Sequence, residues 1–112
     1  MSVDGGGVPA LRLDKFLWFA RLARTRSAAA RLCAEGRVEI AGVAAFKPHQ
    51  LVRIGDWITV EQGRWRRRIR VTALGERRGG VAEAHRLYGE PAPPQPIARE
   101  PWVALLEEEV GA

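Results

Sequence analysis

Cysteine and long apolar runs are the scarcest features of this 112-residue chain. Cys33 is the single cysteine, so no disulfide can form within the chain, and a disulfide-stapled secreted fold is excluded. The longest stretch that is both uncharged and apolar, from Ile40 to Phe46, is far shorter than the roughly 20 residues that span a bilayer. The opening residues show no signal-peptide pattern. We therefore expect a soluble cytoplasmic protein without a membrane partner.

Groups that carry catalysis are also few. His49, His85 and Cys33 lack the spacing of zinc ligands, and neither histidine has a nucleophile near it in the sequence. Asp14 and Asp56 are explained by a helix start and a turn, which leaves no acid to act as a general base. The three leader glycines are not followed by the residues of a phosphate-binding loop. The sequence predicts a non-enzyme with no catalytic residue, metal, cofactor or small-molecule substrate.

Acidic residues are sparse where basic residues are dense. Residues 12–78 contain 16 Lys and Arg against 6 Asp and Glu, a net charge of +10, whereas residues 79–112 carry a net charge of −4. A positive charge this dense repels itself in the folded state and is typical of a protein that binds a polyanion. General use of arginine as a surface charge is the alternative, but it does not explain the acidic end. Nucleic acid is the first predicted partner.

Two short helices are predicted at the start of the domain. The first has apolar residues at the i, i+3, i+4 and i+7 positions, which are Leu13, Phe16, Leu17 and Ala20. The second begins after Thr25 or Ser27 as the N-cap, runs through alanines, and ends at Gly36. A chain of 112 residues is one ordinary domain, so we expect these helices to belong to a single folded unit that acts as a monomer.

The signals after Gly36 change to short antiparallel strands, which makes the predicted fold class α+β. The expected strands cover residues 38–40, 51–54, 57–60 and 64–71. Trp57 and Trp65 are predicted to be core residues, and Arg67 is predicted to mark a sheet edge or a bulge. A short helix is expected over 81–88, an extended proline-rich segment from Glu90 onward, and a helical turn or a disordered end over 102–110.

Six short motifs occur in one order along the first half of the chain: Arg-Leu-Asp-Lys-Phe-Leu-Trp at 12–18, Thr-Arg-Ser at 25–27, Glu-Gly-Arg-Val at 35–38, Gly42, Lys-Pro at 47–48 and Gly-Asp-Trp-Ile-Thr-Val at 55–60. In this register they resemble the RNA-binding domain named after ribosomal protein S4. The resemblance implies the S4-type (alpha-L) fold, in which two N-terminal helices form an L-shaped pair on a small curved antiparallel sheet. It also implies that RNA lies on the face of the helix pair.

The sequence more specifically resembles the heat shock protein 15 family of stand-alone S4-domain proteins. The residues that carry this resemblance are 17–21 and the Glu, Arg, Gly, Leu and Tyr pattern across 76–88. It implies binding to ribosomal RNA, and to transfer RNA, on the large ribosomal subunit in the rescue of stalled translation. The chain departs from the family at Phe16, where tryptophan is frequent, and in its proline-rich acidic end, which replaces a long basic tail.

The resemblance and the composition together divide the chain into four predicted parts. These are a flexible leader at 1–9, the S4 RNA-binding domain at 10–75, a family-like helical extension at 76–90 and a proline-rich acidic tail at 91–112. Three functions stay open. The first is an RNA-binding factor for stalled large subunits, the second is an assembly or structural protein on ribosomal RNA, and the third is a DNA-binding protein.

The predicted RNA-binding residues lie on the helix pair or in the loops beside it. The turn before the second helix combines cations, hydroxyls and the N–H groups of a helix start, which suit a phosphate. The alternatives are an N-cap role for Thr25 or Ser27, a pair between Arg31 and Glu35, and a solvated loop at Lys47. The full predicted set is Arg12, Lys15, Arg24, Thr25, Arg26, Ser27, Arg31, Arg37 and Lys47.

A second basic row alternates along the last predicted strand. Its members, which are either solvated or secondary RNA contacts, are Arg64, Arg66, Arg68 and Arg70. Trp18 lies near Lys15 on the helical wheel, so it either packs in the core or offers its ring to a base.

Overall fold

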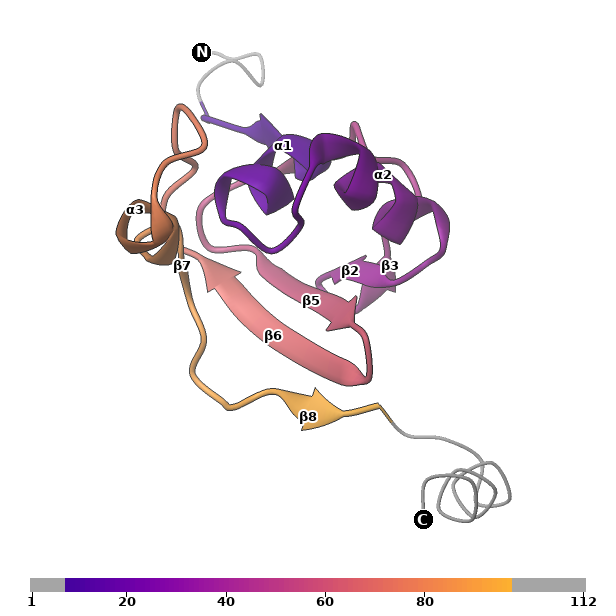
Figure 1. Cartoon of the computed structure of the whole chain (residues 1–112). Helices are drawn as coiled ribbons and strands as arrows, with labels where there is room; N and C mark the ends of the chain where they lie inside the picture. The colour runs from indigo at the N-terminus through magenta and orange to yellow at the C-terminus, as the bar shows by residue number, and fades with distance from the viewer. Residues whose placement is uncertain (1–7, 98–112) are drawn as a thin grey trace, which may run out of the picture.

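The computed structural model describes residues 8–97, which form three helices and eight strands (Figure 1). The helices are α1 (Leu13–Phe19), α2 (Arg26–Ala34) and α3 (Val81–His85). The strands are β1 (Leu11–Arg12), β2 (Val38–Ile40), β3 (Val43–Ala44), β4 (Leu51–Val52), β5 (Trp57–Gln62), β6 (Trp65–Val71), β7 (Tyr88–Gly89) and β8 (Gln95–Pro96). All the strand pairs in this part of the chain are antiparallel, which confirms the predicted α+β fold class.

The main sheet is built around the long hairpin of β5 and β6. Its strand order is β3-β2-β5-β6-β7, β8 pairs with the start of β6, and β1 pairs with β4 in a separate small sheet. Ile58 faces Ile69 across the hairpin, and both side chains are fully buried. This face packs toward α1 and α2 (Figure 1). Because side chains alternate along a strand, the opposite face carries polar residues together with Trp57.

The two N-terminal helices meet through a sharp turn. The helix α1 ends at Ala20, and Arg21 adopts a left-handed backbone with φ of 58°, from which its Nε donates to the Gly79 carbonyl at 2.9 Å. The helix α2 begins where the Thr25 hydroxyl accepts the Ala28 N–H at 2.9 Å, as predicted for an N-cap. Buried residues of both helices, including Phe16, join the sheet residues in one core.

Gly36 ends α2 as predicted. Its φ is +71°, and hydrogen bonds from Gly36 to the Cys33 carbonyl and from Arg37 to the Leu32 carbonyl form the Schellman arrangement. A side chain at this position is disfavoured mainly by the backbone conformation, and its Cβ atom would also lie 2.9 Å from the ring of the exposed Phe46, which would have to move.

Two predictions for the sheet are wrong, and a third is only partly right. Trp57 lies on the outer face next to the inward-facing Ile58, and it is only half-buried. Trp65 is 51% exposed because the sheet extends beyond the part that the helices cover. Arg67 lies within an unbroken register of β5 and β6, so it marks no bulge. On its other side it falls between the residues of β6 that pair with β8 and those that pair with β7, so within the described residues it lies at an unpaired edge, as the sheet-edge alternative predicts.

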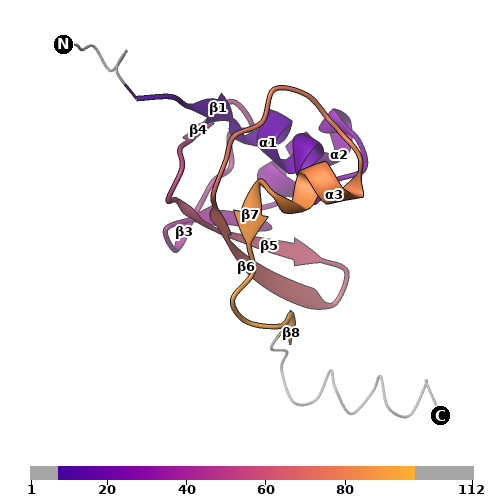
Figure 2. The same cartoon turned by 90° about the vertical axis from the view of Figure 1, so that its left-hand side faces the viewer.

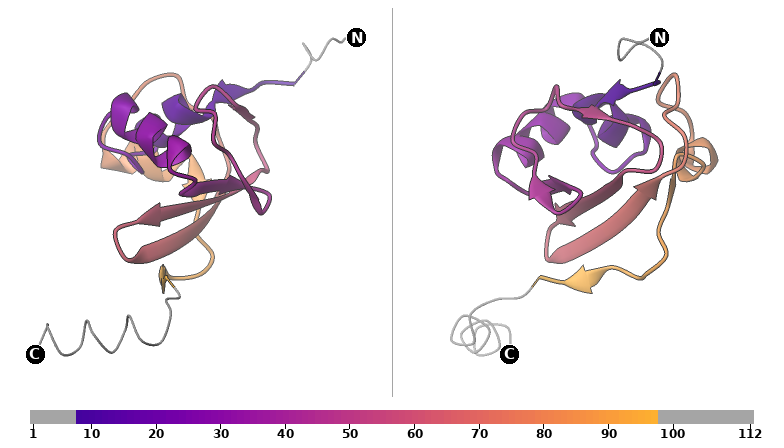
Figure 3. Two further views of the ribbon diagram at one scale, coloured as in Figure 1. Left: turned by 90° about the vertical axis from the view of Figure 1, so that its right-hand side faces the viewer. Right: turned by 180° about the vertical axis from the view of Figure 1, so that it is seen from behind.

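The segment after β6 folds back on the domain in a way that the sequence did not predict. The helix expected over 81–88 ends at His85, and Tyr88–Gly89 pairs with the end of β6 as β7 (Figure 2). The proline-rich segment is extended as predicted, but Gln95–Pro96 pairs with the start of β6 (Figure 3). The helical turn or disordered end expected over 102–110 lies outside the described residues. Within residues 8–97, no helix is long and apolar enough to cross a membrane.

An ion pair between Arg67 and Glu90 joins β6 to the segment after β7. Two parallel hydrogen bonds of 2.9 and 2.8 Å connect the guanidinium and the carboxylate, and Arg67 also donates to the Tyr88 hydroxyl at 3.3 Å. The hydrogen bonds from Arg67 lower the pKa of Glu90 below its usual value. The pair therefore stabilises the fold above the usual pKa of glutamate, and this contribution is lost as the pH falls through the lowered pKa.

We expect Glu90→Gln to lower the free energy of unfolding by about 1–2 kcal/mol at pH 7 and by much less near pH 3. Urea unfolding at the two pH values measures the difference. Glu76→Gln is the control because Glu76 is exposed, and it should change neither value. An equal loss from Glu90→Gln at both pH values would contradict a role for the charged pair.

Candidate nucleic-acid interface

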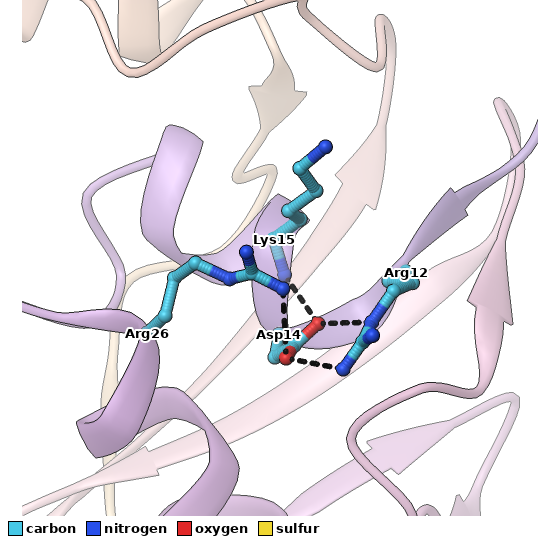
Figure 4. Close-up of polar contacts among 4 residues, drawn as sticks. All are labelled: Arg12, Asp14, Lys15 and Arg26. Atoms are coloured by element: carbon cyan, nitrogen blue, oxygen red, sulfur yellow. Dashed lines mark hydrogen bonds and ion pairs between the residues drawn. The ribbon is translucent and has the colours of Figure 1, made fainter.

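A buried carboxylate organises the positive charge at the start of the helix pair. The side chain of Asp14, the second residue of α1, is 6% exposed. Its Oδ1 accepts from the Lys15 N–H at 2.8 Å and from Arg12 Nε at 3.1 Å. Its Oδ2 accepts from Arg12 Nη2 at 2.9 Å and from Arg26 Nη2 at 3.4 Å (Figure 4). One carboxylate thus holds two guanidinium groups, one from β1 and one from α2.

This Asp14 cluster, comprising Arg12, Asp14, Lys15 and Arg26, keeps a net positive charge. The guanidinium side chains of Arg12 and Arg26 are 46% and 42% exposed, so each keeps donors that a ligand can reach. Lys15 extends away from the carboxylate, and its Nζ lies 5.9 Å from the centre of the Phe19 ring (Figure 4). Side chains that are already held in place lose less entropy when they bind a phosphate.

The loop containing Lys47 lies beside the start of α1. The carbonyls of Gln50 and Pro48 accept the N–H groups of Leu13 at 2.7 Å and of Asp14 at 3.0 Å. These bonds use donors that a helix start would otherwise leave open, so α1 does not offer a backbone anion site there. They also hold Lys47, which is exposed, next to the Asp14 cluster.

The start of α2 contributes a second group of donors. Arg24, Thr25 and Ser27 are all exposed around the turn and the first residues of the helix. Thr25 serves as the N-cap, so the N-cap alternative is confirmed for that residue, and the Ser27 hydroxyl lies free of that role on the helix surface. Cations, a hydroxyl and the positive end of a nine-residue helix therefore face solvent together.

Arg31 and Arg37 differ in their surroundings. Arg31 is exposed, and it lines a groove of about 400 Å³ along α2 together with Arg24 and Arg37, so the difference lies in their ion pairs. The alternative pair with Glu35 does not form, because Glu35 lies 3.6 Å from Arg37 instead. Arg37 is also 3.8 Å from Glu61, so two carboxylates offset its charge. Arg37 is therefore the predicted site residue whose charge is most offset within the described chain.

Trp18 packs at the junction between α1 and the C-terminal extension. It is half-buried against the core, and the Arg78 guanidinium lies 5.9 Å from its ring centre. Arg78 Nε also donates to the Trp18 carbonyl at 3.1 Å. This arrangement agrees with the core-packing alternative, and it shows that the segment before α3 holds the end of α1.

The secondary row lies on a different surface. Arg66, Arg68 and Arg70 project from the face of β6 opposite the helices, and Arg64 lies in the turn before β6. Arg66 pairs with Glu61 at 2.9 Å. The structure therefore places Arg68 and Arg70 apart from the helix pair, whereas Arg37 of the primary set and Arg66 of the row pair with the same carboxylate, that of Glu61.

The described residues offer no ligand set for a metal ion. Within residues 8–97, no three of His, Cys, Asp and Glu are grouped closely enough to hold one. Burial, and to a smaller extent the charge of Asp14, raises the pKa of Cys33 to about 11. The thiol is therefore protonated at neutral pH and is a core side chain rather than a nucleophile.

The chain matches proteins of one family in sequence. The S4 domain model matches residues 11–58, which include both N-terminal helices and the whole Asp14 cluster. The heat shock protein 15 homolog of Haemophilus influenzae is 38% identical over 80 residues, which are 71% of this chain and 60% of that protein. Heat shock protein 15 of Escherichia coli K12 is 38% identical over 82 residues, 73% of this chain and 61% of that protein. The chain spans about 60% of the length of these relatives.

The match extends to a solved structure. The structure of heat shock protein 15 of Vibrio cholerae, described as trimeric, superposes on this chain with a TM-score of 0.71 at 35% sequence identity. The superposition covers 93% of this chain and 94% of the Vibrio cholerae chain. Similarity over that share includes α3 and β7, beyond the S4 domain itself. This chain therefore belongs to the heat shock protein 15 family of RNA-binding S4-domain proteins.

Proposed function

We propose that this protein binds structured ribosomal RNA, together with transfer RNA, on stalled large ribosomal subunits in the cytoplasm. The observation that carries the proposal is the Asp14 cluster, in which one buried carboxylate holds two half-exposed arginines beside Lys15. We name the whole area the helix-pair surface and assign to it Arg12, Lys15, Arg24, Thr25, Arg26, Ser27, Arg31 and Lys47.

Folded RNA suits the helix-pair surface better than duplex DNA does. Structured RNA is read largely by shape and by contacts to phosphates and 2′-hydroxyls, for which arginines and hydroxyls are the matching groups. The exposed polar side chains of α2 are Arg26, Ser27 and Arg31, without the paired amide groups that commonly read adenine in a major groove.

Sedimentation of the tagged protein from a lysate tests this assignment. We expect it to travel with free large subunits that carry peptidyl-tRNA, and the share bound should rise when translation is stalled. Cosedimentation with immature particles would instead favour an assembly role, and recovery with the nucleoid would favour DNA binding.

We propose that a single copy of the chain is the binding unit, because Arg12, Asp14 and Arg26 already contact one another within one chain. The Vibrio cholerae relative is described as trimeric. Light scattering of the RNA-bound protein distinguishes a monomer from a trimer by mass, and we expect a complex with one chain per RNA.

RNA binding should weaken steeply with salt. Each cation that neutralises a phosphate contributes about −0.9 to the slope of log affinity against log salt for a duplex, so four contacts reduce affinity about 100-fold between about 50 and 200 mM salt. Fluorescence anisotropy of a labelled RNA hairpin measures the slope. A flat response would contradict binding through phosphates.

A further inference from the structure

The outer face of the β5–β6 hairpin carries a second concentration of positive charge. Arg70 lies opposite Trp57 and Arg68 lies opposite Thr59, so all four side chains occupy the face turned away from the helices. Arg68 and Arg70 are exposed, and neither has an acidic partner among the described residues. Their charge is therefore open to a ligand, unlike that of Arg66, which pairs with Glu61.

Trp57 supports these two arginines. The guanidinium carbon of Arg68 lies 4.2 Å from the centre of the indole ring, and that of Arg70 lies 5.7 Å from it. A guanidinium at this distance is held by the π face and still presents its other side to solvent. The result is a planar cation in a fixed position, on which a nucleic-acid base can stack.

The C-terminal segment forms a wall beside these residues. A cavity of about 280 Å³ lies between Arg66 and Arg68 on one side and Ala92, Pro93 and Gln95 on the other. The pairing of Gln95 with Arg66 holds this segment in place. The part of the outer face around Arg68 is thus a bounded groove and not only a charged strand, and Arg70 and Trp57 lie beside it on the same face.

We propose that this groove binds a single-stranded RNA segment, separately from the helix-pair surface. Alternate residues on a strand are about 7 Å apart, a spacing comparable to that of successive phosphates in an extended RNA strand. Sites that bind single-stranded nucleic acid combine cations along the phosphate backbone with flat side chains on which the bases stack. With its two surfaces on different faces, the protein holds two RNA segments at once. This inference is independent of the proposed function.

Three double variants, each of which lowers the net charge by three, test the proposal. The outer-face variant is Arg68→Gln with Arg70→Glu, the helix-pair variant is Lys15→Glu with Arg26→Gln, and the control is Arg77→Gln with Arg86→Glu near α3. Two probes with different dyes are used, an oligouridylate of about 12 nucleotides and a folded RNA hairpin. Affinities are measured by anisotropy, and joint binding of both probes is measured by energy transfer between the dyes.

We expect the outer-face variant to lose about tenfold in oligouridylate affinity with little change for the hairpin, and the helix-pair variant to show the opposite. The wild type should bind both probes together. Loss of oligouridylate from the helix-pair variant alone, or equal loss from the control, would overturn the second site. If the protein binds the oligouridylate but does not sediment with large ribosomal subunits, the proposed function is overturned and the second site is not.

A second variant keeps the test valid if the outer-face variant fails to fold. Arg68→Lys with Arg70→Lys keeps the charge but removes the planar groups that stack on Trp57. We expect it to bind the oligouridylate several-fold more weakly and the hairpin normally. Unchanged oligouridylate binding would show that no shaped site exists on this face.

Discussion

Replacing Lys15 with glutamate and Arg26 with glutamine is expected to weaken binding of a folded RNA hairpin by about 100-fold. The Arg26 guanidinium pairs with the buried Asp14 carboxylate, and the adjacent Lys15 extends its ammonium away from it (Figure 4). The double variant therefore removes two phosphate partners and adds a repelling charge to one positive surface. Anisotropy at a fixed salt concentration gives the ratio of affinities.

The fold should survive this change. Glutamine is chosen at position 26 because a glutamate there would place a second carboxylate next to Asp14. Lys15 is half-buried, and a surface substitution there usually costs within about 0.5 kcal/mol. Arg26→Gln removes one charged partner of the buried Asp14 carboxylate, so we expect it to cost about 1–2 kcal/mol, while Arg12 still pairs with that carboxylate. Thermal unfolding followed by circular dichroism checks the fold. An equal loss of hairpin affinity in Arg77→Gln with Arg86→Glu would mean that total charge, not the helix-pair surface, drives binding.

The helix pair could be predicted from the sequence because its signals are local. The apolar spacing of α1, the Thr25 cap and the Gly36 stop each act within a few residues, and the structure confirms all three. The left-handed turn at Arg21 could not be predicted, because its side chain bonds to Gly79, 58 residues later in the chain.

The sheet was predicted less well, because residue type was given more weight than position. Trp57 is adjacent to the inward-facing Ile58, so alternation places it on the outer face despite its apolar ring. Trp65 and Ile69 are four positions apart, so their side chains point to the same face of β6, but Trp65 lies beyond the part of the sheet that the helices cover. The alternation of side chains alone does not show where the core ends. The two-residue strands β7 and β8 exist only as partners of β6 and carry no pattern of their own.

In the candidate site, the cations were identified from the sequence but the residue that arranges them was not. Asp14 was explained by its position in the first turn of α1, which is a favourable place for an acid. Its contact with Arg26 joins residues 12 positions apart and depends on how α2 packs against α1. A buried acid between basic neighbours, in Arg-Leu-Asp-Lys, is the signal in the sequence that points to such a cluster.

Asp14→Asn should weaken RNA binding although it makes the chain more positive. The net charge rises from +5 to +6, which by charge alone would strengthen binding to a polyanion. Asparagine offers one carbonyl oxygen in place of two charged ones, so it cannot hold both Arg12 and Arg26, and their guanidinium groups lose their fixed positions. We expect about a tenfold loss of hairpin affinity and a loss of about 1–3 kcal/mol in the free energy of unfolding.

Asp56→Asn separates the effect of geometry from that of charge. It raises the net charge by the same amount, but Asp56 lies in the turn before β5. Among the described residues its carboxylate accepts only the Arg53 N–H, a role that asparagine can keep. Hairpin affinity in Asp56→Asn should stay equal to that of the wild type or rise slightly. Tighter binding by both variants would show that the arginines need no fixed arrangement. Weaker binding by Asp14→Asn alone, measured at temperatures where both variants are folded, means that the carboxylate positions the cations that meet the RNA.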